Sequence, residues 1–339
     1  MRHIVHNRSS IVKRNVYPLK HVLPSRFPRL PRRLTYEGVN VTVCIAAICN
    51  NGENIVCAVD GMLSDTHSSI SGDVAANKIV FLDDWALMLS GSLSNADLIL
   101  EELRLAPEIG EEKLTRANIR DGLAKAYKRQ LSKLVSERTL SVYDMDMDEF
   151  KKEGRKYFGD ERFAELSRIM EQDASTFQDS ILVAGWGAAE ASANIFGVDA
   201  AGFASHTLNG FAAIGSGGMV AMSTLLQLWR GRHMTTEDAL YAVASAKFAS
   251  ETCMGVGEGT TMSLLRKRRE ADDKDAPVAR LLQPEHVKQL RKLWKKHGRP
   301  QIPESAITVL HQIAADIEAP SGTGFIRALK RARMSRGKK

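Results

Sequence analysis

Three polar residues stand at the ends of three consecutive segments whose apolar pattern predicts β-strands. Thr42 begins the first segment, Asp60 ends the second and Lys78 begins the third. Antiparallel neighbours in a meander bring such ends to one edge of a sheet, so the three side chains are expected to meet. A free threonine amine can accept the hydroxyl proton, while a lysine cation lowers the pKa of that amine and stabilises an oxyanion. The set therefore predicts nucleophilic catalysis by threonine. A structural Asp60–Lys78 ion pair is the alternative.

Other catalytic patterns are missing from the sequence. It contains no G-x-S-x-G, HExxH, EF-hand or Walker A motif, and His67, His206 and His233 have no serine or cysteine partner at a recognisable spacing. We therefore expect no metal and no cofactor. The stretch Gly215-Ser216-Gly217-Gly218 precedes a predicted helix and is open to two interpretations. It can hold an anion on free N–H groups, or it can simply turn the chain tightly.

The four cysteines lie in apolar segments without the paired spacing of a metal site: Cys44, Cys49, Cys57 and Cys253. On one strand, Cys44 and Cys49 would point to opposite faces. We interpret all four as small core residues in a reducing compartment. A cytoplasmic location is expected because residues 1–40 lack the apolar core of a secretory signal.

Composition is typical of soluble globular proteins, with 44% hydrophobic and 26% charged residues in 339. No apolar run approaches the about 18 residues of a membrane span, so no membrane association is expected. The net charge of +7 is unevenly placed: residues 1–40 hold nine Lys/Arg and one acid, a net +8, which leaves −1 for the rest. This distribution argues against nucleic-acid binding by the folded part.

Residues 1–40 are not expected to belong to the folded domain. They are rich in arginine and hold four of the ten prolines, without a sustained apolar period. Such a segment is typical of a flexible tail, a removable presequence or text upstream of the true start. A GTG codon at Val41 would be read as Met at a start, and removal of that Met would expose Thr42.

The order of the predicted elements indicates an α+β fold. Two hairpins, 42–49 with 54–60 across an Asn-Gly turn and 78–82 with 85–90 across Asp83-Asp84, precede helices over 95–105 and 115–140. A charged insertion at 141–178 carries a helix around 161–171, and its acidic run 145–150 is interpreted as a solvated turn. The remaining elements of the domain are four strands, two helices and a last strand, over 180–185, 193–198, 202–208, 211–214, 219–229, 235–251 and 260–265. This order predicts a four-layer αββα sandwich with two sheets face to face.

The tail 266–339 is predicted to be helical and basic, with helices over 284–297 and 306–317.

Several stretches together resemble a proteasome β-type subunit of the N-terminal nucleophile (Ntn) hydrolases. They are "TVCIAAICNNGENIVCAVDG", "NKIVFLDDWALMLSGSLSNADLILEEL", "DSILVAGW", "ANIFGVDAAGFASHTLNGFAAIGSGGMVAMSTLLQLW" and "MTTEDALYAVASAKFASE". No single motif is diagnostic, but the order and spacing hold over residues 42–265, interrupted at 141–178. The resemblance implies a divergent, bacterial-type proteasome-like protein.

The resemblance also assigns roles to individual residues. Thr42 matches the nucleophile, whose own amine is the general base, with Lys78 and Asp60 as its catalytic partners. Gly91 matches the glycine whose N–H stabilises the oxyanion. The remaining matches are Ser216, which contacts the amine of the nucleophile, and Glu251, near a second acid that is usually Asp.

Two positions depart from the family pattern. Met254-Gly255 stands where a serine-glycine pair is expected, and Val41 replaces the glycine that usually precedes the threonine. A β-branched residue at the cleaved bond crowds the N→O acyl shift, so self-cleavage of the N-terminal segment is disfavoured.

The preferred hypothesis is a threonine endopeptidase that acts on polypeptides in a self-compartmentalising ring or spiral of identical subunits. The tail 266–339 could dock a neighbour or an ATP-dependent unfoldase. A non-catalytic scaffold subunit and an Ntn amidase for a small molecule are the alternatives. Nucleic-acid contact by the basic ends is a further one.

Overall fold

The computed structural model describes residues 42–65, 70–73, 78–107, 109, 114–187, 190, 192–268 and 278–298. All of them belong to the second of the two units into which the chain divides, Glu37–Lys339. The N-terminal segment 1–40 and the predicted helix over 306–317 lie outside the described residues.

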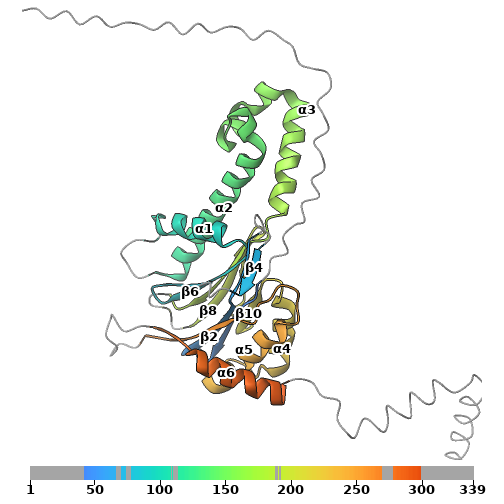
Figure 1. Cartoon of the computed structure of the whole chain (residues 1–339). Helices are drawn as coiled ribbons and strands as arrows, with labels where there is room; N and C mark the ends of the chain where they lie inside the picture. The colour runs from blue at the N-terminus through green and yellow to red at the C-terminus, as the bar shows by residue number, and fades with distance from the viewer. Residues whose placement is uncertain are drawn as a thin grey trace, which may run out of the picture. The chain divides into compact units, whose positions relative to one another are not determined.

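Two five-stranded antiparallel sheets form the frame of the described domain (Figure 1). The first has the order β10-β1-β2-β11-β12 and the second β5-β6-β7-β8-β9, while β3 and β4 pair separately. The strands are β1 Cys44–Cys49, β2 Asn54–Asp60, β3 Met62–Asp65, β4 Ile70–Asp73, β5 Ile79–Leu82, β6 Trp85–Ser90, β7 Ser180–Gly185, β8 Asn194–Asp199, β9 Gly202–Ser205, β10 Phe211–Ile214, β11 Thr260–Arg266 and β12 Ala279–Leu281. The helices are α1 Leu93–Arg104, α2 Arg116–Leu140, α3 Met147–Ser175, α4 Gly218–Leu228, α5 Thr236–Ser250 and α6 Pro284–Leu293.

The predicted opening hairpin is present. β1 and β2 are antiparallel, with Cys44 opposite Val59. The turn between them runs through residues 50–52, all of which have positive φ. Asn and Gly adopt this left-handed region more readily than other residues, which is why the Asn-Gly pair predicted the turn.

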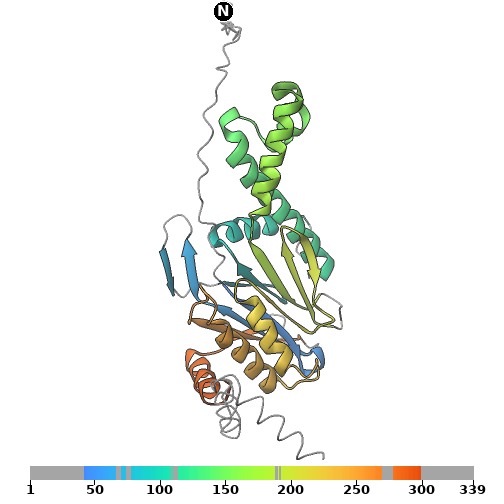
Figure 2. The ribbon, with the colours of Figure 1, turned by 90° about the vertical axis from the view of Figure 1, so that its right-hand side faces the viewer.

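The two faces of β1 pack against different layers, because side chains alternate along a strand. Ile45 and Cys49 belong to an apolar cluster with residues of α4 and α5, whereas Cys44 and Ile48 belong to a cluster shared with the second sheet. The prediction that Cys44 and Cys49 face opposite ways is thus confirmed. The outer face of the second sheet packs on α1 and α2, partly through Trp85. Figure 2 shows the two sheets and the helices that pack on them from a second side.

Helices α2 and α3 pack on each other and extend past the sheets in both views (Figures 1 and 2). Their contact has its own apolar cluster, which includes Val135, Phe150 and Met170. The prediction of a short helix around 161–171 was wrong in extent, since α3 begins at Met147. The side chain of Asp146 caps its first turn by accepting from two backbone N–H groups. The acidic run 145–150, interpreted from sequence as a solvated turn, is therefore a helix N-terminus.

Three further elements differ from the prediction. The β3–β4 hairpin was not predicted, β9 ends at Ser205 and not at residue 208, and β12 adds a strand beside β11. The predicted helix over 284–297 is present as α6, followed by one π-helical turn over 294–298. None of the described helices is long and apolar enough to span a membrane.

Candidate active site

Thr42 lies at the entry to β1, two residues before the strand begins, and only 1% of it is exposed. Its backbone N–H donates to Ser216 Oγ at 3.2 Å. Its carbonyl oxygen accepts from the N–H of Gly217 at 3.2 Å and from the Ser216 hydroxyl at 3.3 Å. The turn before α4 therefore holds the Thr42 backbone on both sides, and the predicted contact between Ser216 and the threonine nitrogen is present.

Lys78 joins Thr42 to Asp60. Its Nζ donates to Thr42 Oγ1 at 2.6 Å and to Asp60 Oδ1 at 3.0 Å, and the lysine is 2% exposed. The three residues meet as predicted, but the reason given from sequence was wrong. β1 and β2 belong to the first sheet, whereas Lys78 precedes β5 at the edge of the second. The group therefore forms where two facing sheets approach, not along one meander.

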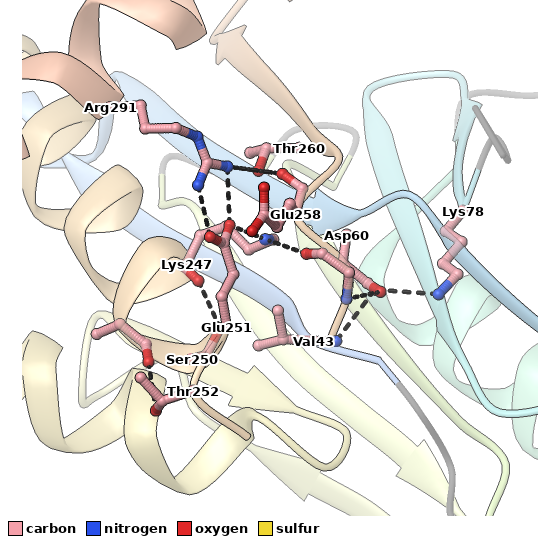
Figure 3. A network of polar contacts seen from close by, with 12 residues as sticks. Val43, Asp60, Lys78, Lys247, Ser250, Glu251, Thr252, Glu258, Thr260 and Arg291 are labelled. Atoms are coloured by element: carbon pink, nitrogen blue, oxygen red, sulfur yellow. Dashed lines mark hydrogen bonds and ion pairs between the residues drawn. The ribbon is translucent and has the colours of Figure 1, made fainter. Parts of the chain in front are cut away.

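The Asp60 carboxylate is fully buried and accepts from several donors. Oδ1 receives the backbone N–H of Val43 at 3.2 Å in addition to Lys78, and Oδ2 receives the N–H of Gly257 at 3.4 Å. Figure 3 shows Asp60 between Lys78 and Val43. A buried carboxylate held by a cation and two N–H groups fixes the lysine ammonium in place.

The turn at 215–218 supports the tight-turn interpretation of its glycines. The N–H of Gly217 donates to the carbonyl of Thr42 and that of Gly218 to the carbonyl of Gly215, so both N–H groups already have partners in the protein. Gly215 has φ +89°, and a Cβ there would overlap the Thr42 carbonyl oxygen. Only glycine meets both conditions.

A second glycine turn lies at the end of β6. Gly91 has φ +113°, and a Cβ there would overlap the Asp179 carboxylate. Before it, Ser90 is buried, and its Oγ lies 2.9 Å from the place that a Gly215 Cβ would take. The Ser90–Gly91 turn thus lies beside the turn that holds Thr42. Among the described residues, Ser90 Oγ has no hydrogen-bond partner.

Asp179 was missed from sequence. Its Oδ1 accepts from the N–H of Ser92 at 2.6 Å and its Oδ2 from the Asn95 side chain at 2.7 Å, so it fixes the turn that contains Gly91. Burial raises the pKa of this carboxyl above its ordinary value. Its only signal in the sequence is an acid directly before a buried strand.

Glu251, directly after α5, pairs with two cations. Its carboxylate contacts Lys247 Nζ at 2.6 Å and the guanidinium of Arg291 at 2.5 and 2.8 Å. These contacts do not test its assignment as a group acting at the nucleophile, which stays a prediction.

The buried thiols are poor nucleophiles. Burial raises the pKa of Cys49 to about 11 and that of Cys57 to about 12, and burial with the nearby Asp60 carboxylate raises that of Cys44 further. All three stay protonated near neutral pH, which fits the interpretation as core residues. In the part of the chain that the structure describes, no group of three or more His, Cys, Asp or Glu is arranged to hold a metal.

Comparisons with known proteins find similarity among solved structures. No protein-family model and no curated protein matches the chain. Among solved structures it is similar to eukaryotic HslV from Trypanosoma brucei, at 18% identity and a TM-score of 0.40, over 67% of this chain and 100% of that one. A likeness at this level says nothing about catalysis, substrate or assembly.

Proposed function

We propose that this protein is a threonine-type Ntn hydrolase that cleaves peptide bonds, with Thr42 as nucleophile. The observation that carries the proposal is the lysine ammonium held between a threonine hydroxyl at 2.6 Å and a carboxylate at 3.0 Å, all three residues being at most 2% exposed. Such a cation is placed to stabilise an alkoxide on Oγ1. The resemblance of residues 42–265 to proteasome β-type subunits supports the same assignment. Under this proposal, the packed helices and sheets are the four-layer αββα sandwich of that family.

Attack requires a free amine on Thr42. The amine takes the Oγ1 proton, Oγ1 bonds to the substrate carbonyl carbon, and the carbonyl electron pair moves to oxygen. The N–H of Gly91 and the Lys78 charge are the proposed stabilisers of that oxyanion. The intermediate collapses, the C–N bond breaks and the leaving amine takes the proton from the threonine ammonium. Water then hydrolyses the ester, with the amine again as base.

Ser216 is positioned to orient this amine. In the described chain its Oγ already contacts the Thr42 nitrogen at 3.2 Å. A released amine at the same point would keep this partner while gaining the ability to accept a proton. Removal of residues 1–41, or a start at Val41, is the proposed route to that state.

The assembly and substrate follow from the same resemblance. We propose a homo-oligomeric ring or spiral in the cytoplasm that encloses the sites and takes unfolded polypeptides, with an ATP-dependent unfoldase as partner. An Ntn amidase for a small molecule would share the mechanism, and its small oligomer would distinguish it.

Hydrolysis of fluorogenic peptides by purified variants tests the activity. Thr42→Ala should abolish cleavage and Lys78→Met should lower it strongly, while Thr42→Ser, which keeps a hydroxyl, should retain part of it. Circular dichroism of each variant checks that the fold is intact. Cleavage by a folded Thr42→Ala protein at the parental rate would exclude the proposal.

A scaffold subunit is the second candidate, favoured by Val41 where glycine usually precedes the nucleophile. In that case the N-terminal segment stays attached, the Thr42 nitrogen remains an amide, and Asp60–Lys78 is a structural ion pair.

A further inference from the structure

A chain of polar contacts leads from the Asp60 carboxylate to helix α6. Its first link is Gly257, whose N–H donates to Asp60 Oδ2 at 3.4 Å and whose carbonyl oxygen accepts from Lys247 Nζ at 2.9 Å. The same residue is thus bound from both sides. Displacement of Lys247 would therefore move the Gly257 N–H group that donates to Asp60.

Lys247 on α5 is held in turn by Glu251, which lies one helical turn later, at the C-cap of the helix. Their ion pair measures 2.6 Å, and Lys247 is fully buried. A buried ammonium needs such a partner, because an unpaired charge in the core is strongly unfavourable. Lys247 also interacts electrostatically with Asp60, so its charge bears on that carboxylate directly.

Arg291 on α6 completes the chain (Figure 3). Its two guanidinium nitrogens contact both Glu251 oxygens, at 2.5 and 2.8 Å, in a bidentate pair. Such a pair fixes the orientation of a carboxylate better than a single contact does. The guanidinium also lies over the Phe248 ring, 4.2 Å from its centroid.

The same arginine contacts the loop that carries Gly257. It donates to the Glu258 carbonyl at 2.6 Å and to Thr260 Oγ1 at 3.2 Å. Thr260 begins β11 and lies directly opposite Asp60 in the pairing of β11 with β2. Arg291 therefore acts on the surroundings of Asp60 by two routes, through Glu251 and Lys247 and through the loop itself.

Burial along this chain falls steadily from the core to the surface. The side chain of Lys247 is 0% exposed, that of Glu251 12% and that of Arg291 20%. Arg291 belongs to the region after residue 265, which the resemblance to proteasome β-type subunits does not cover. The outermost member thus comes from outside the region of resemblance.

We propose that Arg291 is a positioning residue: through Glu251, Lys247 and the loop 256–259, helix α6 holds the Asp60 carboxylate against Lys78 and so sets the reactivity of Thr42. Glu251 is then a positioning residue as well, not a group that touches the nucleophile. The inference rests on the proposed hydrolase function for its effect on rate, but the contact chain can be tested without it.

The test compares Arg291→Met with Lys288→Met, which removes an exposed cation from the same helix. In Arg291→Met, amide hydrogen exchange in residues 256–259 should become faster. The kcat should fall ~10-fold or more with KM nearly unchanged, because a misplaced Asp60 carboxylate weakens the catalytic step and not substrate binding. Arg291→Lys keeps the positive charge but not the bidentate pair, so its exchange rate and its kcat should lie between those of wild type and Arg291→Met. Lys288→Met should change neither measurement.

A double-mutant cycle separates a chain of contacts from independent effects. If Arg291 acts largely through Glu251, then Glu251→Gln combined with Arg291→Met should cost clearly less than the product of the single effects. Unchanged exchange in 256–259, or fast exchange at full kcat, would overturn the proposal, and so would independent effects. A wild-type protein that cleaves no peptide would remove the proposed function, while exchange would still decide whether Arg291 orders the loop.

Discussion

Two buried lysines stand in the same domain and face different atoms. Lys78 contacts a carboxylate and the Thr42 hydroxyl, whereas Lys247 contacts a carboxylate and the carbonyl oxygen of Gly257. A hydroxyl can lose a proton and attack, whereas a peptide carbonyl can only accept. The comparison teaches that a buried Lys–acid pair does not by itself indicate catalysis, and that the third atom in contact decides the chemistry available.

The two lysines are also placed by different means. Lys247 and Glu251 are four residues apart on one helix, a spacing that brings side chains together locally. Lys78 and Thr42 come from different sheets, so their contact depends on how the sheets face each other. The first pair is a product of helix geometry and the second of the whole fold.

Removing the two cations should have unequal effects, and this is the largest difference expected. Lys78→Met should lower kcat/KM for peptide cleavage by ~10³-fold, because the hydroxyl loses its cation. Lys247→Met should lower it by only ~10-fold, through the position of Asp60. Each should also lower the free energy of unfolding, by less than the about 3–5 kcal/mol typical of an unpaired buried charge, because Asp60 keeps two N–H donors and Glu251 keeps Arg291. Steady-state kinetics measure the loss of kcat/KM, and urea unfolding measures the loss of stability. Equal losses of activity in the two variants would contradict the different roles assigned to Lys78 and Lys247.

The site beside Thr42 also depends on a glycine that the Lys247 group does not share. Gly215→Ala should displace the Thr42 carbonyl and lower both activity and stability, the latter by roughly 1–3 kcal/mol, since its Cβ overlaps backbone at positive φ. Gly159→Ala is the matched control, because Gly159 has φ +75° with nothing within 4 Å of an added Cβ. If both alanine variants lose the same stability and keep full activity, the overlap at Thr42 has no consequence.

Stability at alkaline pH should reveal the buried Lys247. Burial lowers its pKa below the ordinary value of about 10.4. Between the folded and the ordinary pKa, the unfolded chain binds more protons, so this residue makes stability rise with pH in that window. The difference in unfolding free energy between wild type and Lys247→Met should therefore shift in favour of wild type as pH rises toward 10.4. A difference that is flat or moves the other way would contradict the lowered pKa; Lys288→Met provides the baseline.

Thiol chemistry should have the smallest effect. Cys44 lies next to the site, with its Sγ donating to the Leu89 carbonyl at 3.3 Å, but its pKa is raised by burial and by Asp60. Iodoacetamide at neutral pH should leave peptide cleavage unchanged within experimental error. Inactivation that tracks labelling of Cys44, followed by peptide mass mapping, would shift the nucleophile from the hydroxyl to a thiol.

Local signals in the sequence predicted local structure well. The Asn-Gly turn, the apolar runs of β1 and β2 and the break at Asp83-Asp84 each identify a hairpin, and all depend on neighbouring residues. The extent of α3 was missed because its capping residues resemble a solvated acidic turn.

The sequence predicted that the three residues at the centre of the candidate site would meet, but not which strands bring them together. Thr42, Asp60 and Lys78 carry the resemblance and do meet, yet nothing in their spacing tells that Lys78 belongs to the opposite sheet. Asp179 and Arg291 could not be found, because their partners lie 87 and 40 residues away in sequence. Contacts between distant segments depend on how the elements pack, and this packing cannot be predicted from local patterns in a single sequence.

The most direct test of the central claim is mass spectrometry of the native protein after treatment with a β-lactone, a reagent that acylates nucleophilic hydroxyls. The account predicts a chain whose first residue is Thr42, with the adduct on Thr42 and none in Lys78→Met. A chain that retains residues 1–41 and carries no adduct would contradict it, and the buried Lys78 pair would then be structural like that of Lys247.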